Sequence, residues 1–172
     1  MITRNINNSF KEDIMKKKRI LIISVIMLIF IIFFTLIILS NKMNEKRINL
    51  SITMNSKISD IVYDENKINI YIFWGDGCPH CEEEWKFLKR ITPKYYENIH
   101  VYGFEVWNSK ENQKIMDEFK DKLNISKDSG IPLTIIEDKY YIGYDESYND
   151  EMLKLIKNNH KNSKDIYLDK NL

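Results

Sequence analysis

The most strongly patterned part of the chain is an unbroken apolar run near its beginning. Residues 20–39, ILIISVIMLIFIIFFTLIIL, carry no charge, and their only polar side chains are Ser24 and Thr35. A helix needs about 20 apolar residues to cross the hydrocarbon core of a bilayer, so this run is long enough to span. The apolar region of a signal peptide is shorter, about 7–15 residues, and ends at small residues such as alanine. The chain contains no alanine, and the run is therefore predicted to be an uncleaved transmembrane anchor.

After residue 47 the pattern changes to short segments that alternate between strand-like and helix-like periodicity. The strand-like segments are 48–54, 68–74, 99–107, 133–137 and 140–144, and the helix-like segments are 56–67, 79–91, 109–123 and 147–160. Ser56 is the expected N-cap of the first helix, and Thr92-Pro93 is expected to end the second. Strand–helix alternation followed by a hairpin predicts an α/β sandwich with a mixed central sheet flanked by helices.

These segments divide the 172 residues into one folded domain and its attachments, since a typical domain takes about 100–200 residues. The expected parts are a cytoplasmic tail (1–19), the transmembrane anchor (20–39), a polar linker (40–47), the folded domain (48–160) and a polar C-terminal tail (161–172).

Basic residues gather on one side of the apolar run. Residues 16–19 are all Lys or Arg and adjoin its start, whereas the basic residues that follow it are fewer and more widely spread. The positive-inside rule then leaves the N-terminal tail in the cytoplasm and puts the folded domain outside, on a single-pass membrane protein. The formal net charge of +1 and the lack of a basic stripe argue against a nucleic-acid partner.

The chain's two cysteines, Cys78 and Cys81, form a C-P-H-C motif directly after the strand-like segment 68–74. Outside the cytoplasm a disulfide between them can persist. A structural staple is a weak interpretation, because stabilisation by a cross-link grows with the loop that it closes. A zinc site needs four ligands, and local spacing puts neither His100 nor His160 beside the pair. Thiol chemistry without a metal or cofactor is therefore favoured, and delivery of a soft metal stays as an alternative.

Thiol-disulfide exchange predicts a role for each residue of the C-P-H-C motif. A helix that begins at Pro79 places Cys78 at its N-terminus, where the helix dipole favours the nucleophilic thiolate. Cys81 lies one turn inward and is expected to be the resolving thiol. His80 is expected to stabilise the Cys78 thiolate by donation or by charge. The three glutamates at 82–84 are expected to be mostly solvated and to oppose thiolate formation with their charge.

The segment 48–160 resembles the thioredoxin superfamily. The resemblance is carried by the strand IYIFW that leads into GDGCPHC and by SGIPLTI about 50 residues later, before the hairpin. C-P-H-C is also similar to the motif of DsbA-like dithiol oxidases. The resemblance implies a thioredoxin-like sandwich in which Pro132 is cis and lies opposite the cysteines, while Ile131 presents its backbone to an incoming peptide.

Two positions depart from the family pattern. Many relatives carry a buried acid six residues before the first cysteine, often with a lysine facing it. Here the acid position holds Ile72, and the lysine would fall near Gly103. Glu105 shares the strand face of Gly103 and is the candidate substitute for the acid. A solvated edge glutamate is the competing interpretation of Glu105.

The expected function is that of a membrane-tethered, extracytoplasmic thiol-disulfide oxidoreductase, acting on cysteine-containing exported proteins together with an unidentified redox partner. His80 and the helix N-terminus favour a dithiol oxidase. The glutamates, and a domain too small for the extra helical insertion of DsbA-like enzymes, favour a reductant similar to the tethered thioredoxins of cytochrome c maturation. A binding module without catalytic activity is the remaining alternative, and the oxidase is preferred.

Overall fold

The computed structural model describes the backbone of residues 2–158 and 164–168, and side chains from residue 14 onward within these ranges. The chain divides into two compact units, Met1–Glu45 and Lys46–Leu172. Helix α1 (Ile2–Leu50) makes up the first unit and continues into the second.

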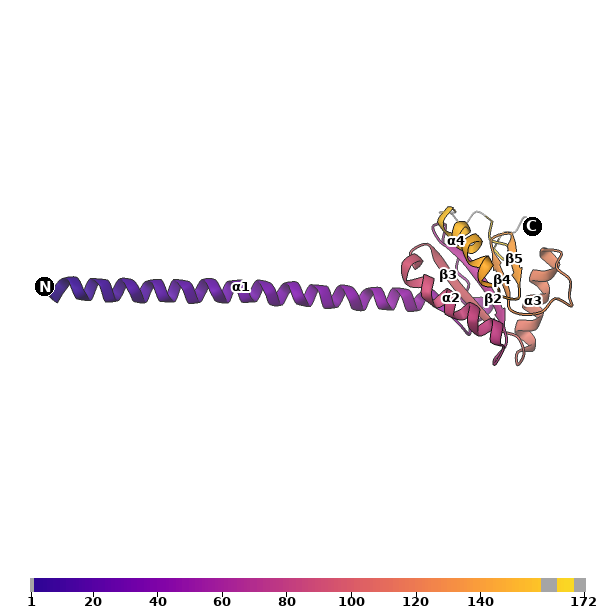
Figure 1. Cartoon of the computed structure of the whole chain (residues 1–172), viewed down its shortest axis with the longest axis horizontal. Helices are drawn as coiled ribbons and strands as arrows, with labels where there is room; N and C mark the ends of the chain where they lie inside the picture. The colour runs from indigo at the N-terminus through magenta and orange to yellow at the C-terminus, as the bar shows by residue number, and fades with distance from the viewer. Residues whose placement is uncertain (1, 159–163, 169–172) are drawn as a thin grey trace. The chain divides into compact units, whose positions relative to one another are not determined.

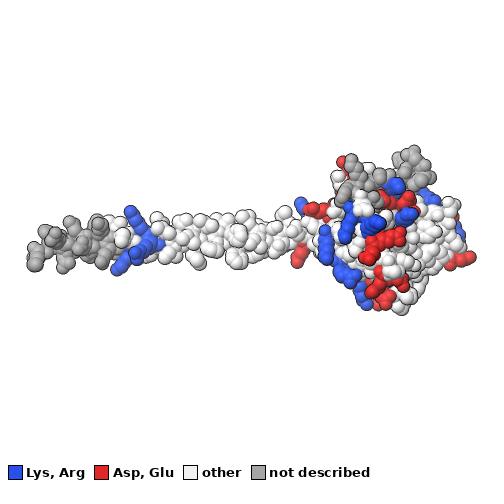
Figure 2. Space-filling view, turned by 45° about the horizontal axis from the view of Figure 1, so that its top comes forward, with Lys and Arg blue, Asp and Glu red and all other residues white. Residues whose placement is uncertain are grey.

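The apolar part of α1 has its side chains exposed along its whole length. Figure 2 shows this stretch as free of charged atoms, with the Lys and Arg side chains of residues 16–19 at one end. Its two hydroxyls are satisfied within the helix, because Ser24 donates to the carbonyl of Leu21 and Thr35 to that of Ile32 (2.8 Å each). Such a segment suits lipid, where each polar group needs an internal partner. By length and composition the helix could cross a membrane.

The second unit contains a five-stranded mixed sheet in the order β1-β3-β2-β4-β5 (Figure 1). The strands are β1 (Ile52–Thr53), β2 (Ile68–Trp74), β3 (Ile99–Glu105), β4 (Leu133–Ile136) and β5 (Lys139–Ile142). The first three are parallel to one another, whereas β4 is antiparallel to both β2 and β5. The predicted α/β sandwich with a mixed central sheet and a terminal hairpin is confirmed.

Three helices cover the two faces of the sheet: α2 (Pro79–Tyr95), α3 (Lys110–Lys122) and α4 (Asn149–Asn158). Along the central strand, Ile68, Ile70 and Ile72 pack in one cluster with α2 and α4. Tyr71 and Phe73 point to the opposite face and pack in a second cluster with α3. Successive residues of a strand face opposite sides, so the almost wholly apolar sequence of β2 matches a strand covered on both faces.

The helix predicted over 56–67 is wrong, since the structure has only the short 3-10 turn Ile58–Asp60 in that segment. Carboxylates compete with helical bonding here: Asp60 accepts from the backbone N–H of Lys57 (2.8 Å) and Asp64 from that of Asn66 (2.9 Å). Such local bonds offer the backbone an alternative to the helix. Ser56 is not an N-cap, because its hydroxyl donates to the carbonyl of Thr53.

Pro93 does not end the second helix as predicted, because α2 continues to Tyr95 with Pro93 inside its last turn. The proline removes one donor, but few helical bonds remain to be lost so close to the helix end. Ile91 and Thr92 are buried, and the Thr92 hydroxyl donates to the carbonyl of Leu88 (2.7 Å). Burial of this turn therefore outweighs the local preference of proline.

Both ends of the domain differ from the expected boundaries. Residues 40–47, expected as a linker, are helical and belong to α1, and the expected strand 48–54 is reduced to the two-residue β1. At the other end, α4 is preceded by the 3-10 turn Glu146–Tyr148, while residues 159–160 of the expected helix lie outside the described residues. The described part of the expected polar tail packs on the domain, where the Asp165 carboxylate accepts from Asn69 and Tyr71.

Candidate functional site

The turn between β2 and α2 delivers the first cysteine to the start of a helix. Strand β2 ends at Trp74, and Gly77 has a φ of +77°, a left-handed conformation that glycine adopts without steric penalty. The N–H of Cys78 donates to the carbonyl of Gly75 (3.1 Å), which closes the turn. Cys78 is thus the N-cap of α2 and Pro79 its first residue, as predicted.

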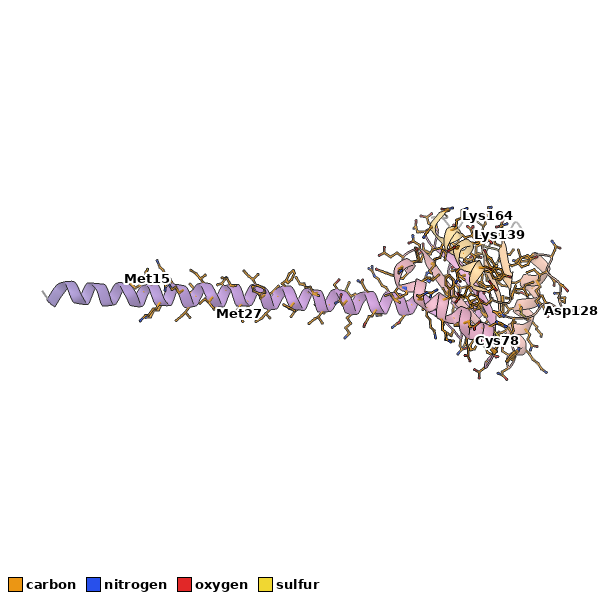
Figure 3. The ribbon with its side chains drawn as sticks, in the orientation of Figure 1. Met15, Met27, Cys78, Asp128, Lys139 and Lys164 are labelled. Carbon is orange, nitrogen blue, oxygen red and sulfur yellow. A yellow bond between two sulfur atoms is a disulfide. The ribbon has the colours of Figure 1, made fainter. Side chains whose placement is uncertain are left out.

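Cys78 and Cys81 are joined in a disulfide, with their Cα atoms 5.2 Å apart (Cys78 is labelled in Figure 3). Cys78 Sγ accepts a hydrogen bond from the backbone N–H of Cys81 (3.3 Å). Cys78 is 6% exposed and Cys81 is 0% exposed. An attacking thiolate can therefore reach only the first sulfur without rearrangement. That sulfur, when released, meets free N–H groups and the positive end of the α2 dipole.

His80 points along the outer surface of α2. Its side chain is 68% exposed, and its Nδ1 lies 3.5 Å from Glu83 Oε2, one turn further on. The contact that the structure gives His80 is thus with a carboxylate of the same helix.

The loop before β4 lies beside the cysteine turn. Because β4 runs antiparallel to β2, with Leu133 opposite Phe73, Pro132 stands at the end of the sheet where β2 leads to Cys78. The Ile131–Pro132 peptide bond is cis, as the family resemblance implied. The Ile131 side chain approaches Gly75 so closely that a Cβ there would lie 2.8 Å from Ile131 Cδ1.

Trp107 is a residue of this region that the sequence analysis did not single out. It is 55% exposed, and its ring packs against Gly75, leaving no space for a Cβ at that position. Its position in the sequence could have indicated this, because it follows by two residues a strand, β3, that is parallel to β2 and ends at the same edge of the sheet.

Glu105, the candidate substitute for a buried acid, is hydrogen-bonded to the backbone of the turn after β3. Its carboxylate accepts from the backbone N–H groups of Trp107 and Asn108 (2.9 Å each). It is half-buried and pairs in register with Trp74. These bonds shape the chain between β3 and α3.

Ile72 and Gly103, where the thioredoxin resemblance leads one to look for an acid and a lysine, lie next to each other. Ile72 and Gly103 are register partners on β2 and β3. The indole of Trp85 fills the space over Gly103, where a Cβ would lie 2.5 Å from its Cζ2 atom. Trp85 also makes an edge-to-face contact with Trp74, whose Nε1 donates to the carbonyl of Met54 (2.9 Å).

A buried carboxyl group comes instead from α2. Glu84 is 0% exposed, so the prediction that all three glutamates are solvated is wrong for this one. Its carboxyl group lies near the Thr134 hydroxyl of β4, but within the described residues neither oxygen accepts a hydrogen bond of good geometry. Burial raises the pKa of Glu84 to about 8, against a smaller lowering by the Thr134 hydroxyl.

The helical period explains this placement and could have predicted it. The buried residues of α2 recur every three or four positions: Cys81, Glu84, Trp85, Phe87, Leu88, Ile91 and Thr92. Glu82 and Glu83 fall on the solvent side of the same turn. A buried Cys81 therefore implies a buried residue 84, whatever its charge.

The metal-delivery alternative can be compared with the arrangement of the described side chains. Within residues 2–158 and 164–168, no group of three His, Cys, Asp or Glu residues is placed to hold an ion. His100 stacks on Tyr102 in β3, with ring centroids 5.8 Å apart, and burial lowers the pKa of its imidazole. His160 lies outside the described residues.

No family model matches the chain, and no curated protein sequence does. Several solved structures are similar to part of it, including a glutaredoxin and a thioredoxin-like protein. A glutaredoxin from Archaeoglobus fulgidus matches with a TM-score of 0.37 and 22% identity, over 49% of this chain and 85% of its own. An uncharacterized thioredoxin-like protein from Clostridium perfringens matches with a TM-score of 0.45 and 18% identity, over 64% of this chain and 85% of its own. Neither likeness bears on the chemistry of the site.

Proposed function

We propose that this chain, whose folded domain has the thioredoxin-like strand order and cysteine placement, is a membrane-tethered thiol-disulfide oxidoreductase acting outside the cytoplasm. The observation that carries the proposal is the Cys78–Cys81 disulfide at the N-terminus of α2. One sulfur is partly accessible and the other is fully enclosed. That asymmetry suits an exchange centre, in which one sulfur meets the client and the other closes the cycle.

Oxidation of a client proceeds in two exchanges. A client thiolate attacks Cys78 Sγ, the bond to Cys81 breaks, and Cys81 leaves with the electron pair. A second client thiolate then attacks the client sulfur of this mixed disulfide and releases Cys78 as a thiolate. The client gains a disulfide, and the protein accepts two electrons as a dithiol. The same steps in reverse reduce a client disulfide.

Direction depends on how strongly the site stabilises the Cys78 thiolate, because that stabilisation favours the reduced protein. The N-terminus of α2 and the C-P-H-C motif support the oxidase. Burial supports it too, since Glu84 with a pKa of about 8 is mostly neutral at pH 7 and adds little opposing charge. We therefore propose a dithiol oxidase of exported proteins.

A reductant is the second candidate, and the connection between β3 and β4 favours it. The chain between Glu105 and Leu133 holds the single helix α3 of 13 residues. The helical insertion typical of DsbA-like oxidases is missing from this segment. The reduction potential of the Cys78–Cys81 pair distinguishes the two candidates: a value near −120 mV supports the oxidase and one near −270 mV the reductant.

Trapping of mixed disulfides tests the exchange function itself. In Cys81→Ser the client stays attached to Cys78, because no second thiol can displace it. In Cys78→Ser the remaining thiol is enclosed, so few clients are expected. The measurement is the amount of dithiothreitol-sensitive adduct on non-reducing gels, with the double serine variant as the blank. Equal trapping by the two single variants, or none by either, contradicts the proposal.

A further inference from the structure

When the disulfide opens, the inner sulfur, that of Cys81, needs a proton. When a client thiolate attacks Cys78, Cys81 departs as a thiolate into a position that is 0% exposed. A charge without a partner is strongly unfavourable in such surroundings. The side chains of Ile72 and Leu88, which belong to the apolar cluster between α2 and the sheet, offer no proton. Exchange at Cys81 therefore needs a proton source within the protein.

Glu84 is placed to supply it. Cys81 and Glu84 are three residues apart on α2 and both belong to its buried side. Side chains at this spacing are neighbours, with Cβ atoms about 5–6 Å apart. Glu84 thus lies about one helical turn after Cys81, on the buried side of α2.

Among the described residues, the Glu84 carboxyl group has the Thr134 hydroxyl of β4 as a polar neighbour, which lowers its pKa by less than burial raises it. Within the residues described, neither Glu84 oxygen makes a hydrogen bond of good geometry, with Thr134 or with any other residue, and the Thr134 hydroxyl makes none either. Leaving a buried polar group unsatisfied is destabilising by about 1–3 kcal/mol. An apolar residue would serve packing better, so packing alone does not explain a glutamate here.

Two tyrosines pack in the cluster that α2 forms with the sheet. Tyr141 is the register partner of Thr134, and burial, with a smaller contribution from Glu151, raises its pKa to about 12. Tyr144, from the segment after β5, is the second: burial is the main cause that raises the pKa of Tyr144, and the charge of Glu84 adds to the rise. The Tyr144 hydroxyl is committed to Asn149, to which it donates (3.0 Å). Burial also sets the pKa of Glu84 at about 8, where a carboxyl group can both give and take a proton near neutral pH.

We propose that Glu84 carries the proton for Cys81, giving it when the Cys78–Cys81 bond opens and taking it back when the bond closes. On opening, the protonated carboxyl protonates the departing Cys81 thiolate and becomes a carboxylate. On closing, the carboxylate takes the proton of the Cys81 thiol, and the thiolate attacks Cys78 Sγ and expels the client thiolate. The role is the same for an oxidase and a reductant, and it rests on the proposed exchange function.

The test measures disulfide opening in the full-length protein in detergent. The oxidised protein is mixed with an excess of a single-cysteine peptide, and opening is followed by the fluorescence of the nearby tryptophans from pH 6 to 10. The rate is divided by the concentration of peptide thiolate. Wild type should be fast at low pH and slow down through pH 8, as Glu84 loses its proton. Glu84→Gln should be slower at pH 7 by about 10²-fold, within the range for general acid–base catalysis, and lack this inflection.

Glu82→Gln is the matched control, because it removes one exposed carboxylate from the same turn of α2. It should keep the wild-type pH profile. A Glu84→Gln profile within about twofold of this control at every pH overturns the inference. A wild-type protein that never opens its disulfide contradicts the exchange function instead.

A second measurement needs no variant. Carbon-13 NMR of the Glu84 carboxyl, in the oxidised and the reduced full-length protein, should give different titration midpoints, because a shared proton couples Glu84 to the Cys81 thiol. Identical midpoints in the two forms overturn the inference even if Glu84→Gln does not fold.

Discussion

Glu83 and Glu84 are consecutive residues with opposite surroundings. Glu83 lies at the surface of α2 beside His80, whereas Glu84 is enclosed between α2 and the sheet. Water screens the first charge, so its effect on the sulfurs is weak and depends on salt. The second group responds to burial by holding its proton. The environment of each residue, rather than its type, decides what it contributes to the site.

The exposed pair of His80 and Glu83 leads to a prediction about the reduction potential of the Cys78–Cys81 disulfide. His80→Gly removes a group that can stabilise the Cys78 thiolate, so it should lower the potential by about 30 mV, a tenfold change in the equilibrium constant. Glu83→Gln removes the negative charge 3.5 Å from His80 and should raise the potential. The measurement is redox equilibrium with glutathione at pH 7. Shifts of the same sign in both variants, or none in either, would show that this pair does not tune the site.

The buried carboxyl group of Glu84 leads to a prediction about how the stability of the fold depends on pH. Glu84 has a pKa of about 8 in the folded protein against 4.5 as the reference, so the folded state binds its proton more tightly. Stability should therefore fall as pH rises from about 4.5 to about 8, by up to about 1.4 kcal/mol per pH unit, and level off above. Glu84→Gln should lose this dependence and exceed wild type in melting temperature at pH 8. Thermal denaturation of the oxidised protein from pH 4 to 9 checks it. Parallel curves for the two proteins would show that Glu84 does not titrate as proposed.

Strand β3, helix α2 and Met54, the residue after β1, meet at Gly103. A Cβ at this position would lie 2.5 Å from both the Met54 carbonyl oxygen and the Trp85 ring. Gly103→Ala should therefore lower the free energy of unfolding by about 1–3 kcal/mol, as overpacking does. Gly130→Ala is the control, because a Cβ there meets nothing within 4 Å, and it should change stability by less than about 0.5 kcal/mol. Urea denaturation measures both, and equal effects would contradict the close approach.

Periodicity predicted the long regular elements well, for a physical reason. The β2 segment is apolar and β-branched, and α3 has buried Ile115 and Phe119 at helical spacing with Ser109 as its N-cap. In such segments local preference and burial agree. The start of α2 at Pro79, with Cys78 before it, was equally predictable, because Pro suits the first helical position.

The failures of prediction occurred where tertiary contacts override local signals. Pro93 stays helical because its turn is buried, and segment 56–67 is not helical because its aspartates bond to nearby backbone. The charge of Glu84 predicts a solvated side chain, but its position one turn from Cys81 puts it inside the domain. Packing of Asp165 against Asn69 and Tyr71 joins segments that lie far apart in sequence, and no local pattern contains that information.

The proposed function requires that the cysteine pair face an oxidising compartment. In the cytoplasm glutathione and thioredoxin would keep an exposed exchange centre reduced. The basic residues at 16–19 adjoin the apolar part of α1, and the positive-inside rule keeps such a cluster in the cytoplasm. We therefore predict that the folded domain lies on the outer side. On its visible face acidic and basic side chains are interspersed (Figure 2), which suits a soluble domain beside a membrane.

Labelling of the cysteines in intact cells tests this orientation. After mild reduction, a membrane-impermeant maleimide should modify Cys78 as fully in intact cells as in lysed ones, because the reagent reaches an external domain directly. Cys78→Ser gives the background, since Cys81 is enclosed. Replacing the four basic residues at 16–19 by Gln should reduce labelling in intact cells, because the signal that orients the helix is removed. Replacing Lys42, Lys46 and Arg47 should not reduce it. Labelling that appears only after lysis would put the domain in the cytoplasm, and the role in oxidising exported proteins would then be wrong.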